Sequence, residues 1–230
     1  MARGDDVLVE ERLRELGDRL HGPARLKADL LTEARHALQD AVEAYRDGGL
    51  PGAEAARRAV AEFGEPARLA PAYQAELATG SLRGLSLRVL AVAGVLVVAG
   101  DLTWQGSSWS GGPGPPVAYR LLSGAVNGIW LGAAVLAVAG LTVVAASARS
   151  AHPALPRLAR LTGFALTAAL VLGAASGAAL YGWSVGLWEA ARTWPPMLVG
   201  ALASGAGFLW IGRAARSWLL ATRRRPAEPA

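Results

Sequence analysis

The sequence predicts an all-α protein, with a small N-terminal cytoplasmic helical domain followed by a four-helix transmembrane bundle. Hydrophobic residues make up 53% of the 230 residues, and the charged ones are distributed very unevenly. Residues 1–80 carry 11 basic and 15 acidic side chains, whereas the remaining 150 carry 12 basic and only three acidic ones. A soluble segment of about 80 residues can bury a small core, but the remainder needs lipid as its solvent. We therefore expect a soluble domain at 1–80, the four spans within 81–220, and a basic cytoplasmic tail at 221–230.

The soluble domain is expected to consist of amphipathic helices, because its apolar residues recur every three to four positions. Helices are predicted at about 13–20, 26–45 and 51–63. A fourth begins at Pro66, since proline suits the first turn of a helix. Gly64 is placed to cap the third helix in the left-handed conformation that glycine tolerates.

The connection between this domain and the first span is expected to be a short hinge at residues 78–84. The first 30 residues alternate charges with leucines and lack the apolar core of a signal peptide. We therefore expect no cleavable signal peptide, and we expect the domain to stay on the side of the membrane where it is made.

Four apolar stretches are long enough to cross a bilayer, and each ends at charge, proline or tryptophan. They are predicted at 85–104, 121–146, 161–181 and 195–212. The uncharged run of the first span begins only after Arg88, whose long side chain would reach out to the membrane interface. No Asp, Glu, Lys or His lies near the middle of any span. Ion pumps and intramembrane proteases need such groups, so neither class is expected.

The distribution of arginine predicts that both termini are cytoplasmic. In that orientation the inner segments hold ten arginines, among them Arg223, Arg224 and Arg225, while the outer loops hold only Arg120 and Arg192. Positive residues accumulate on the cytoplasmic side of membrane proteins, and an even number of spans agrees with this orientation. The abundance of Arg, Ala and Gly with a single lysine resembles proteins of high-GC bacteria. We therefore expect a multi-pass protein of a bacterial plasma membrane.

Tryptophans and arginines are the expected membrane-interface residues, since amphipathic side chains settle at the level of the lipid head groups. These residues are Trp104, Trp109, Trp183, Trp188, Arg223, Arg224 and Arg225. The arginine run at the C-terminus would either anchor the tail or bind anionic lipid. The tryptophans of the first outer loop recur about 80 residues later in the second. A duplication of a two-helix unit and an independent accumulation of tryptophan both explain this repeat.

Small residues recur in the spans at the spacing of helix-packing faces. They are Gly124, Gly128, Gly132, Gly173, Gly177, Gly200, Ser204 and Gly207. Such faces permit close approach of helix backbones. They support compact packing, but they do not show which helices pair. Whether the protein forms a homo-oligomer is not determined by the sequence.

The soluble domain carries a recognisable set of elements over residues 30–77. Glu33, His36 and Asp40 lie on one face of the long helix, and Gly48 or Gly49 forms the turn after it. The next helix opens with Glu54, Ala55 and Ala56 and ends at the junction Phe63, Gly64, Glu65, Pro66. With these elements the segment resembles the HAAS-type signalling domain, also called the permease prefix domain 1 family. Pro51 and Gly52 depart from the family pattern, which more often has Ser and Glu there.

The resemblance implies a role for the protein and no chemistry. Domains of this family usually precede transmembrane helices, sometimes of permease type, and their genes often lie beside one for a PadR-like transcription regulator. The resemblance therefore implies that the cytoplasmic domain binds a protein partner. The expected contact residues are Glu33, His36, Asp40, Phe63 and Gly64.

Two functions are expected from the sequence. The first is a membrane-anchored regulatory or sensory protein that binds a PadR-like regulator, and the alternative is an accessory or permease-like subunit of an ABC-type export system. An enzyme is not expected, because the sequence offers no nucleophile with a base, no phosphate loop and no metal cluster. Glu33 and His36 have the spacing of a di-metal half-motif, but a second motif is missing, so no metal or other cofactor is expected. The domain's net charge of −4 argues against direct binding of nucleic acid.

Overall fold

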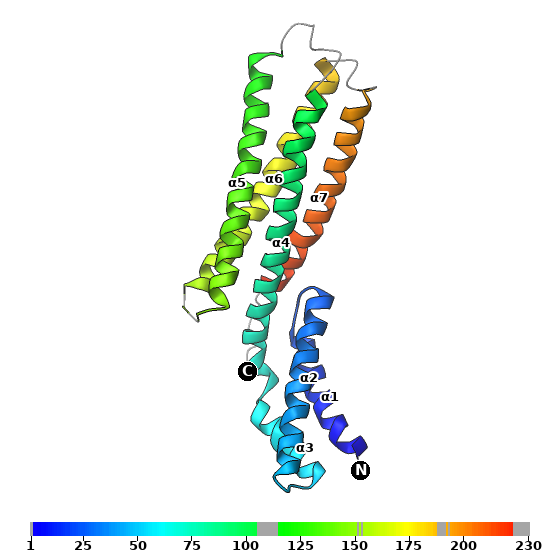
Figure 1. Cartoon of the computed structure of the whole chain (residues 1–230), viewed down its shortest axis with the longest axis vertical. Helices are drawn as coiled ribbons and strands as arrows, with labels where there is room; N and C mark the ends of the chain where they lie inside the picture. Colours follow the sequence, from blue (N-terminus) through cyan, green and yellow to red (C-terminus); the bar gives the residue numbers. More distant parts are fainter. Residues whose placement is uncertain are drawn as a thin grey trace, which may run out of the picture. The chain divides into compact units, whose positions relative to one another are not determined.

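The computed structural model describes residues 2–104, 115–150, 152, 154–187, 192 and 194–222, with the side chains of 2–6 and 97–104 outside the description. Within these residues the protein is all-helical and has no strand, which confirms the predicted fold class. The helices are α1 (Ala2–Arg19), α2 (Ala24–Asp47), α3 (Gly52–Phe63), α4 (Pro66–Trp104), α5 (Val117–Ser147), α6 (Leu155–Leu187) and α7 (Pro195–Thr222) (Figure 1).

The contacts divide the chain into two compact units. The head unit comprises Met1–Ser81 and Ser217–Ala230, and the membrane unit comprises Leu82–Arg216. The boundaries between the units fall inside helices, one within α4 and the other within the last turns of α7. The head unit is therefore built from both ends of the sequence.

The core of the head unit consists of two neighbouring groups of apolar side chains. The first group joins α1, α2 and α3 through residues that include Leu13, Leu38 and Ala56, all at most 3% exposed. The second group consists of the buried Leu16, Leu20 and Leu77, with partly buried side chains packed around them. Phe63 and Tyr73 pack against both groups. Small alanines on α3 let that helix lie close to α1 and α2, as the amphipathic pattern predicts.

Polar side chains connect the head helices at their surface. The Arg35 guanidinium of α2 donates two hydrogen bonds to the Glu10 carboxylate of α1, at 2.7 Å and 2.9 Å. These hydrogen bonds hold the pKa of Glu10 below its ordinary value. The Tyr45 hydroxyl of α2 donates a hydrogen bond to Glu62 of α3. Exposed pairs of this kind contribute modestly, about 0–1 kcal/mol each, so the apolar core determines the fold of the head.

The expected hinge at 78–84 is not a break in the helix, because α4 continues through these residues from Pro66 to Trp104. The boundary between the two units, after Ser81, does fall within this segment. Gly80 and Gly84 lower helix propensity, but tertiary packing overrides that effect here. Leu82 and Leu85 are fully buried, and the side chain of Leu26 lies against Gly80. A helix with such contacts around its glycines does not need to break.

Within the part of the chain that the structure describes, four helices are long and apolar enough to cross a membrane, so the protein is a multi-pass membrane protein. The three complete ones, α5, α6 and α7, have 31, 33 and 28 residues. A helix of 31 residues is about 46 Å long, which exceeds the roughly 30 Å of a bilayer core. The helices are therefore longer than the predicted spans, because those follow uninterrupted hydrophobicity alone.

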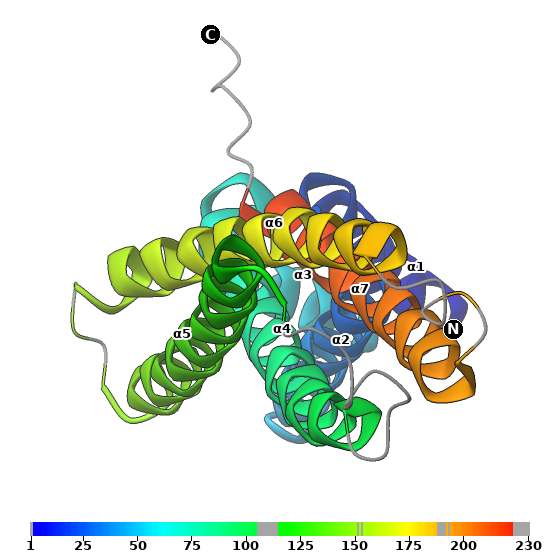
Figure 2. The same cartoon turned by 90° about the horizontal axis from the view of Figure 1, so that it is seen from above.

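Within the membrane unit, α5 and α6 form an antiparallel pair that packs along its length (Figures 1 and 2). The Tyr119 hydroxyl of α5 and the Ser184 hydroxyl of α6 lie 2.8 Å apart at one end of this pair. Large apolar side chains such as Leu131 and Leu202, at 70% and 76% exposed, point away from the packed interior. In a bilayer these surfaces face lipid, where apolar exposure carries no penalty.

Only some of the glycines predicted to form packing faces lie at a helix–helix contact. Gly173 and Gly207 each lie against a side chain of another helix, and so does Gly140, which the spacing did not single out. In contrast, three glycines of α5 have no neighbouring atom within 4 Å of the position that a Cβ would take: Gly124, Gly128 and Gly132. The spacing alone therefore did not identify the face by which α5 packs within the membrane unit.

Arg88 does not end its helix or disturb the packing of the first span. Its guanidinium lies over the ring of Trp210 on α7, 5.4 Å from the ring centre. This cation–π contact contributes about 0.5–2 kcal/mol, depending on how far the pair is removed from water. The positive charge of Arg88, at the start of the first span, is therefore paired with the aromatic ring of Trp210 in the last span.

Candidate functional site

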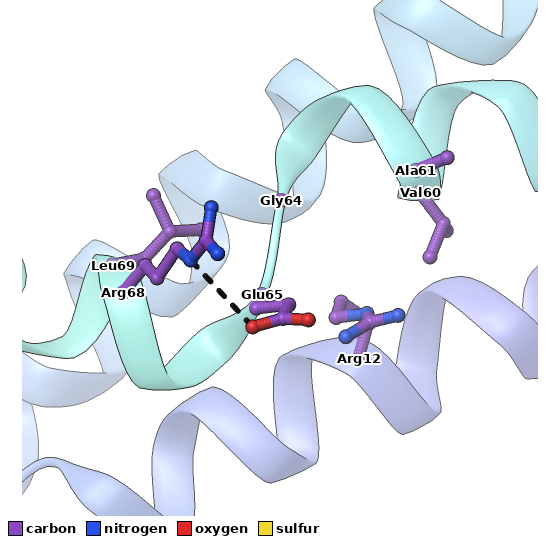
Figure 3. A pocket seen from close by; sticks show the side chains of 7 residues that line it. All are labelled: Arg12, Val60, Ala61, Gly64, Glu65, Arg68 and Leu69. Carbon is purple, nitrogen blue, oxygen red and sulfur yellow. Dashed lines mark ion pairs between the residues drawn. The ribbon is translucent and has the colours of Figure 1, made fainter.

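A surface hollow in the head unit lies at the junction between α3 and α4 (Figure 3). It has a volume of about 390 Å³ and is open to solvent. Its lining comes from α1, the end of α3 and the start of α4, and consists of Arg12, Val60, Ala61, Gly64, Glu65, Arg68 and Leu69. Apolar side chains thus form part of a hollow that has charged side chains around it.

Three charged side chains surround the hollow. Arg68 Nε lies 3.7 Å from Glu65 Oε2, and both side chains are mostly exposed. Figure 3 shows the Glu65 carboxylate extending between Arg68 of α4 and Arg12 of α1. Arg12 pairs at 3.6 Å with Glu15 of its own helix and is 27% exposed. The two arginines can donate hydrogen bonds to an acidic group of a ligand, which would displace the Glu65 carboxylate from Arg68.

Gly64, which lines the hollow, has an unusual backbone conformation. Gly64 has φ +93° and ψ −179°, a combination that residues with a Cβ almost never adopt. This conformation ends α3 at Phe63 and turns the chain so that α4 begins at Pro66, where proline is favoured. The positive φ agrees with the sequence prediction, but the ψ of −179° shows that Gly64 is not in the left-handed helical conformation that was expected.

Replacing Gly64 with alanine is expected to destabilise the head by about 1–3 kcal/mol, because alanine is strained at this φ and ψ. Gly48→Ala is the matched control, since Gly48 has φ −71° and accepts a side chain. Thermal unfolding of the full-length protein in detergent, followed by circular dichroism, measures the difference. Equal melting temperatures for the two variants would contradict this account of the junction.

The structure separates the predicted contact residues into two places. Glu33, His36 and Asp40 lie on the exposed face of α2, and none of them lines the hollow. Gly64 lines the hollow, while the half-buried Phe63 packs into the core beside it. The resemblance-based set therefore contains one surface patch, one residue of the hollow and one core residue.

Among the described residues, no group of three His, Asp or Glu side chains is arranged to hold a metal ion. Glu33, His36 and Asp40 share a helix face without a facing set of ligands. The hollow offers apolar surface next to the guanidinium groups of Arg12 and Arg68.

The expected membrane-interface residues are only partly described. Trp183 of α6 is 37% exposed and contacts the Tyr119 ring edge to face, with ring centres 5.8 Å apart. Trp104 is the last residue of α4, and its side chain lies outside the described part of the structure. The other expected interface residues lie outside the described residues: Trp109, Trp188, Arg223, Arg224 and Arg225.

Sequence reasoning missed Arg12, Arg68 and Leu69 as residues of the hollow. The i, i+3 spacing of Glu65 and Arg68 indicates a local ion pair, but it does not indicate a cavity. Arg12 gave no signal, because 52 residues separate it from Gly64 and only the packing of α1 on α3 brings them together. The hollow is a tertiary feature.

Comparisons with known proteins give no relative from which a function can be transferred. No family model, no curated protein and no solved structure matches the chain. The resemblance of residues 30–77 to the HAAS-type signalling domain therefore stays a prediction.

Proposed function

We propose that this protein is a membrane-anchored regulatory protein whose helical head binds a cytoplasmic protein partner at the hollow beside Gly64. The observation that carries the proposal is the hollow itself, with apolar side chains flanked by Arg12 and Arg68 on the surface of a helical unit. The head is covalently continuous with helices that can cross a membrane. A partner bound there would be held at the membrane.

The chemistry of the hollow favours one kind of ligand. Val60, Ala61 and Leu69 offer apolar surface, and the two arginines offer donors for a carboxylate. An amphipathic helix with an aliphatic residue next to an acidic one supplies both groups. The acidic residue of such a segment would replace Glu65 as the acceptor for Arg68. Arg68 would then exchange its ion pair with Glu65 for one with the partner.

The family resemblance and the charge distribution support a cytoplasmic partner. HAAS-type domains are associated with PadR-like transcription regulators, and the excess of arginine in the inner segments predicts that the head faces the cytoplasm. We therefore propose a PadR-like regulator as the partner. Binding would lower the free concentration of that regulator, to an extent set by the affinity of the head for it.

Crosslinking in native membranes, followed by purification of the tagged full-length protein, tests the proposal. Ala61→Arg fills the hollow from an exposed helix position, and Ala37→Arg makes the same change on the exposed face of α2. We expect Ala61→Arg to reduce recovery of a DNA-binding regulator about tenfold or more, since a clash at an interface centre removes well over 1.4 kcal/mol. Ala37→Arg should retain the regulator.

Two other outcomes of this experiment would place the binding surface outside the hollow. Loss of the regulator with Ala37→Arg alone would move the binding surface to the face that carries Glu33, His36 and Asp40. Recovery of transporter subunits with both variants would show that the spans make the contact, and the alternative of a subunit of an ABC-type export system would replace the regulatory role. Either result would contradict binding at the hollow.

A further inference from the structure

Three segments of the head unit meet at Gly22, in the connection between α1 and α2. The Cβ of Ala221 lies 3.5 Å, and the Cδ1 of Leu77 lies 3.8 Å, from the position that a Cβ on Gly22 would take. Leu77 belongs to α4 and Ala221 to the last turn of α7. The head therefore includes a piece of the last helix of the chain, which lies in contact with Gly22.

Gln74 joins the same three segments through hydrogen bonds. Its Nε2 donates to the carbonyl oxygens of His21 and Ala221, both at 2.6 Å, and its Oε1 accepts from the backbone N–H of His21 at 2.9 Å. A side-chain amide has two N–H donors, and both are used here. The opposite amide orientation would place oxygen against two carbonyl oxygens, so the contacts fix the orientation that the structure shows.

The last turn of α7 is buried as part of the head unit. Trp218 and Ala221 are each 1% exposed, and the contacts group the chain from Ser217 onward with the head. This turn follows the last membrane-crossing helix without a break, since α7 runs from Pro195 to Thr222. Because a helix is stiff, a shift or rotation of the crossing part of α7 is transmitted to Ala221.

The apolar group that contains Leu77 extends to the hollow. Leu77, which contacts the Gly22 position, is buried together with Leu16 and Leu20. Leu69 packs against the same group and also lines the hollow. Packed side chains thus connect the Ala221 contact with the surface proposed to bind a partner.

We propose that residues 217–222 form a latch that couples the last membrane helix to the hollow of the head. With the latch closed, Gln74 holds the Ala221 carbonyl and the apolar group is covered. When the membrane part of α7 moves, Gln74 loses this partner, and the α4 wall of the hollow loosens. The inference rests on the proposed function only in naming the hollow as the surface that the latch controls.

A single thiol reports on the latch in the full-length protein, because the chain has no cysteine. Ala221→Cys is expected to react slowly with a maleimide, whereas Leu220→Cys, at a position 38% exposed, reacts quickly. Adding Gln74→Glu places a carboxylate, which has no donor, against two carbonyl oxygens. We expect Gln74→Glu to speed labelling of the Ala221→Cys variant about tenfold or more, since the carbonyl oxygens of His21 and Ala221 lose their donor and meet a carboxylate instead.

Gln39→Glu is the matched control, because Gln39 is an exposed glutamine of α2 and undergoes the same change of charge. It should leave the labelling of Ala221→Cys unchanged. Hydrogen exchange on the cysteine-free chain gives a second readout, which does not depend on accommodating a thiol at position 221. Gln74→Glu, and not Gln39→Glu, should speed exchange of the amides at 217–222 and also at 60–69, around the hollow.

The latch is overturned if Gln74→Glu changes neither the labelling nor the exchange at 217–222. Its coupling to the hollow is overturned if 217–222 respond and 60–69 do not. Neither measurement uses a partner protein. A failure to recover a regulator would therefore count against the proposed function and leave the latch result as it stands.

Discussion

Replacing Leu16 with alanine is expected to lower the free energy of unfolding of the head by about 2–5 kcal/mol. Leu16 is fully buried at the centre of the group that contains Leu20 and Leu77. Removing three carbon atoms there leaves a cavity that α1 and α4 can fill only by shifting toward each other. The loss is comparable with a large part of the stability of a small domain, which makes this one of the most damaging conservative changes in the head.

Leu8→Ala is the matched control for this variant, because Leu8 lies on the same helix and is 36% exposed. Unfolding of the full-length protein in detergent, followed by hydrogen exchange of the head amides, measures both variants. Leu16→Ala should reduce the protection of α1 and α4 amides strongly, and Leu8→Ala only slightly. Similar protection in the two variants would show that the α1–α4 contact does not stabilise the head.

The helices of the head were predictable because they depend on local patterns. Apolar periodicity indicated α2 and α3, and Gly64 and Pro66 indicated the end of one helix and the start of the next. The continuity of the helix through 78–84 was not predictable, for the opposite reason. Two glycines disfavour a helix locally, but Leu82 and Leu85 are fully buried and keep the helix intact. Burial of this kind is decided by residues distant in sequence.

The membrane-crossing helices were predictable from hydropathy, but the faces by which they pack were not. Gly128 and Gly140 lie on the same helix, and the residues next to each of them in the sequence are mostly apolar. A Cβ added at Gly128 would have no neighbouring atom within 4 Å, whereas one at Gly140 would contact side chains of both α4 and α6. Lipid and protein interiors are equally apolar, so hydrophobicity does not distinguish the surface that meets a helix from the surface that meets lipid.

The candidate site was only partly predictable. Gly64 was identified because a positive φ has a sequence signature, whereas Phe63 turned out to be a core residue. Arg12 and Gln74 matter through contacts with residues more than 50 positions away. No periodicity or spacing reports such contacts, and the last turn of α7 gave no sign that it belongs to the head.

Gly140→Leu is expected to destabilise the membrane unit by about 1–3 kcal/mol or more, through overpacking. A Cβ at Gly140 of α5 would lie 2.6 Å from the Ser86 Oγ of α4 and 3.5 Å from the Thr162 Cγ2 of α6. A leucine there has to push these helices apart, because the rest of its side chain extends further in the same direction. Gly128→Leu, at a position of α5 with no neighbour within 4 Å, should not do so.

The comparison of Gly140→Leu with Gly128→Leu isolates the contact, because both replace a helical glycine by leucine. Each gains about 0.7–1 kcal/mol in helix propensity, so a difference between them reports only what surrounds position 140. Titration with a denaturing detergent, followed by circular dichroism, should give a lower midpoint for Gly140→Leu and an unchanged or higher one for Gly128→Leu. Equal midpoints would contradict the close approach of α4 and α5.

A smaller substitution locates the clash at a single atom. Gly140→Ala brings only a Cβ toward Ser86, whose Oγ is buried and has no hydrogen-bond partner among the described residues. Ser86→Ala removes that oxygen without breaking a hydrogen bond seen in the structure. Ser86→Ala should therefore stabilise Gly140→Ala more than it stabilises the parent protein, and this excess requires Ser86 of α4 and Gly140 of α5 to be in contact.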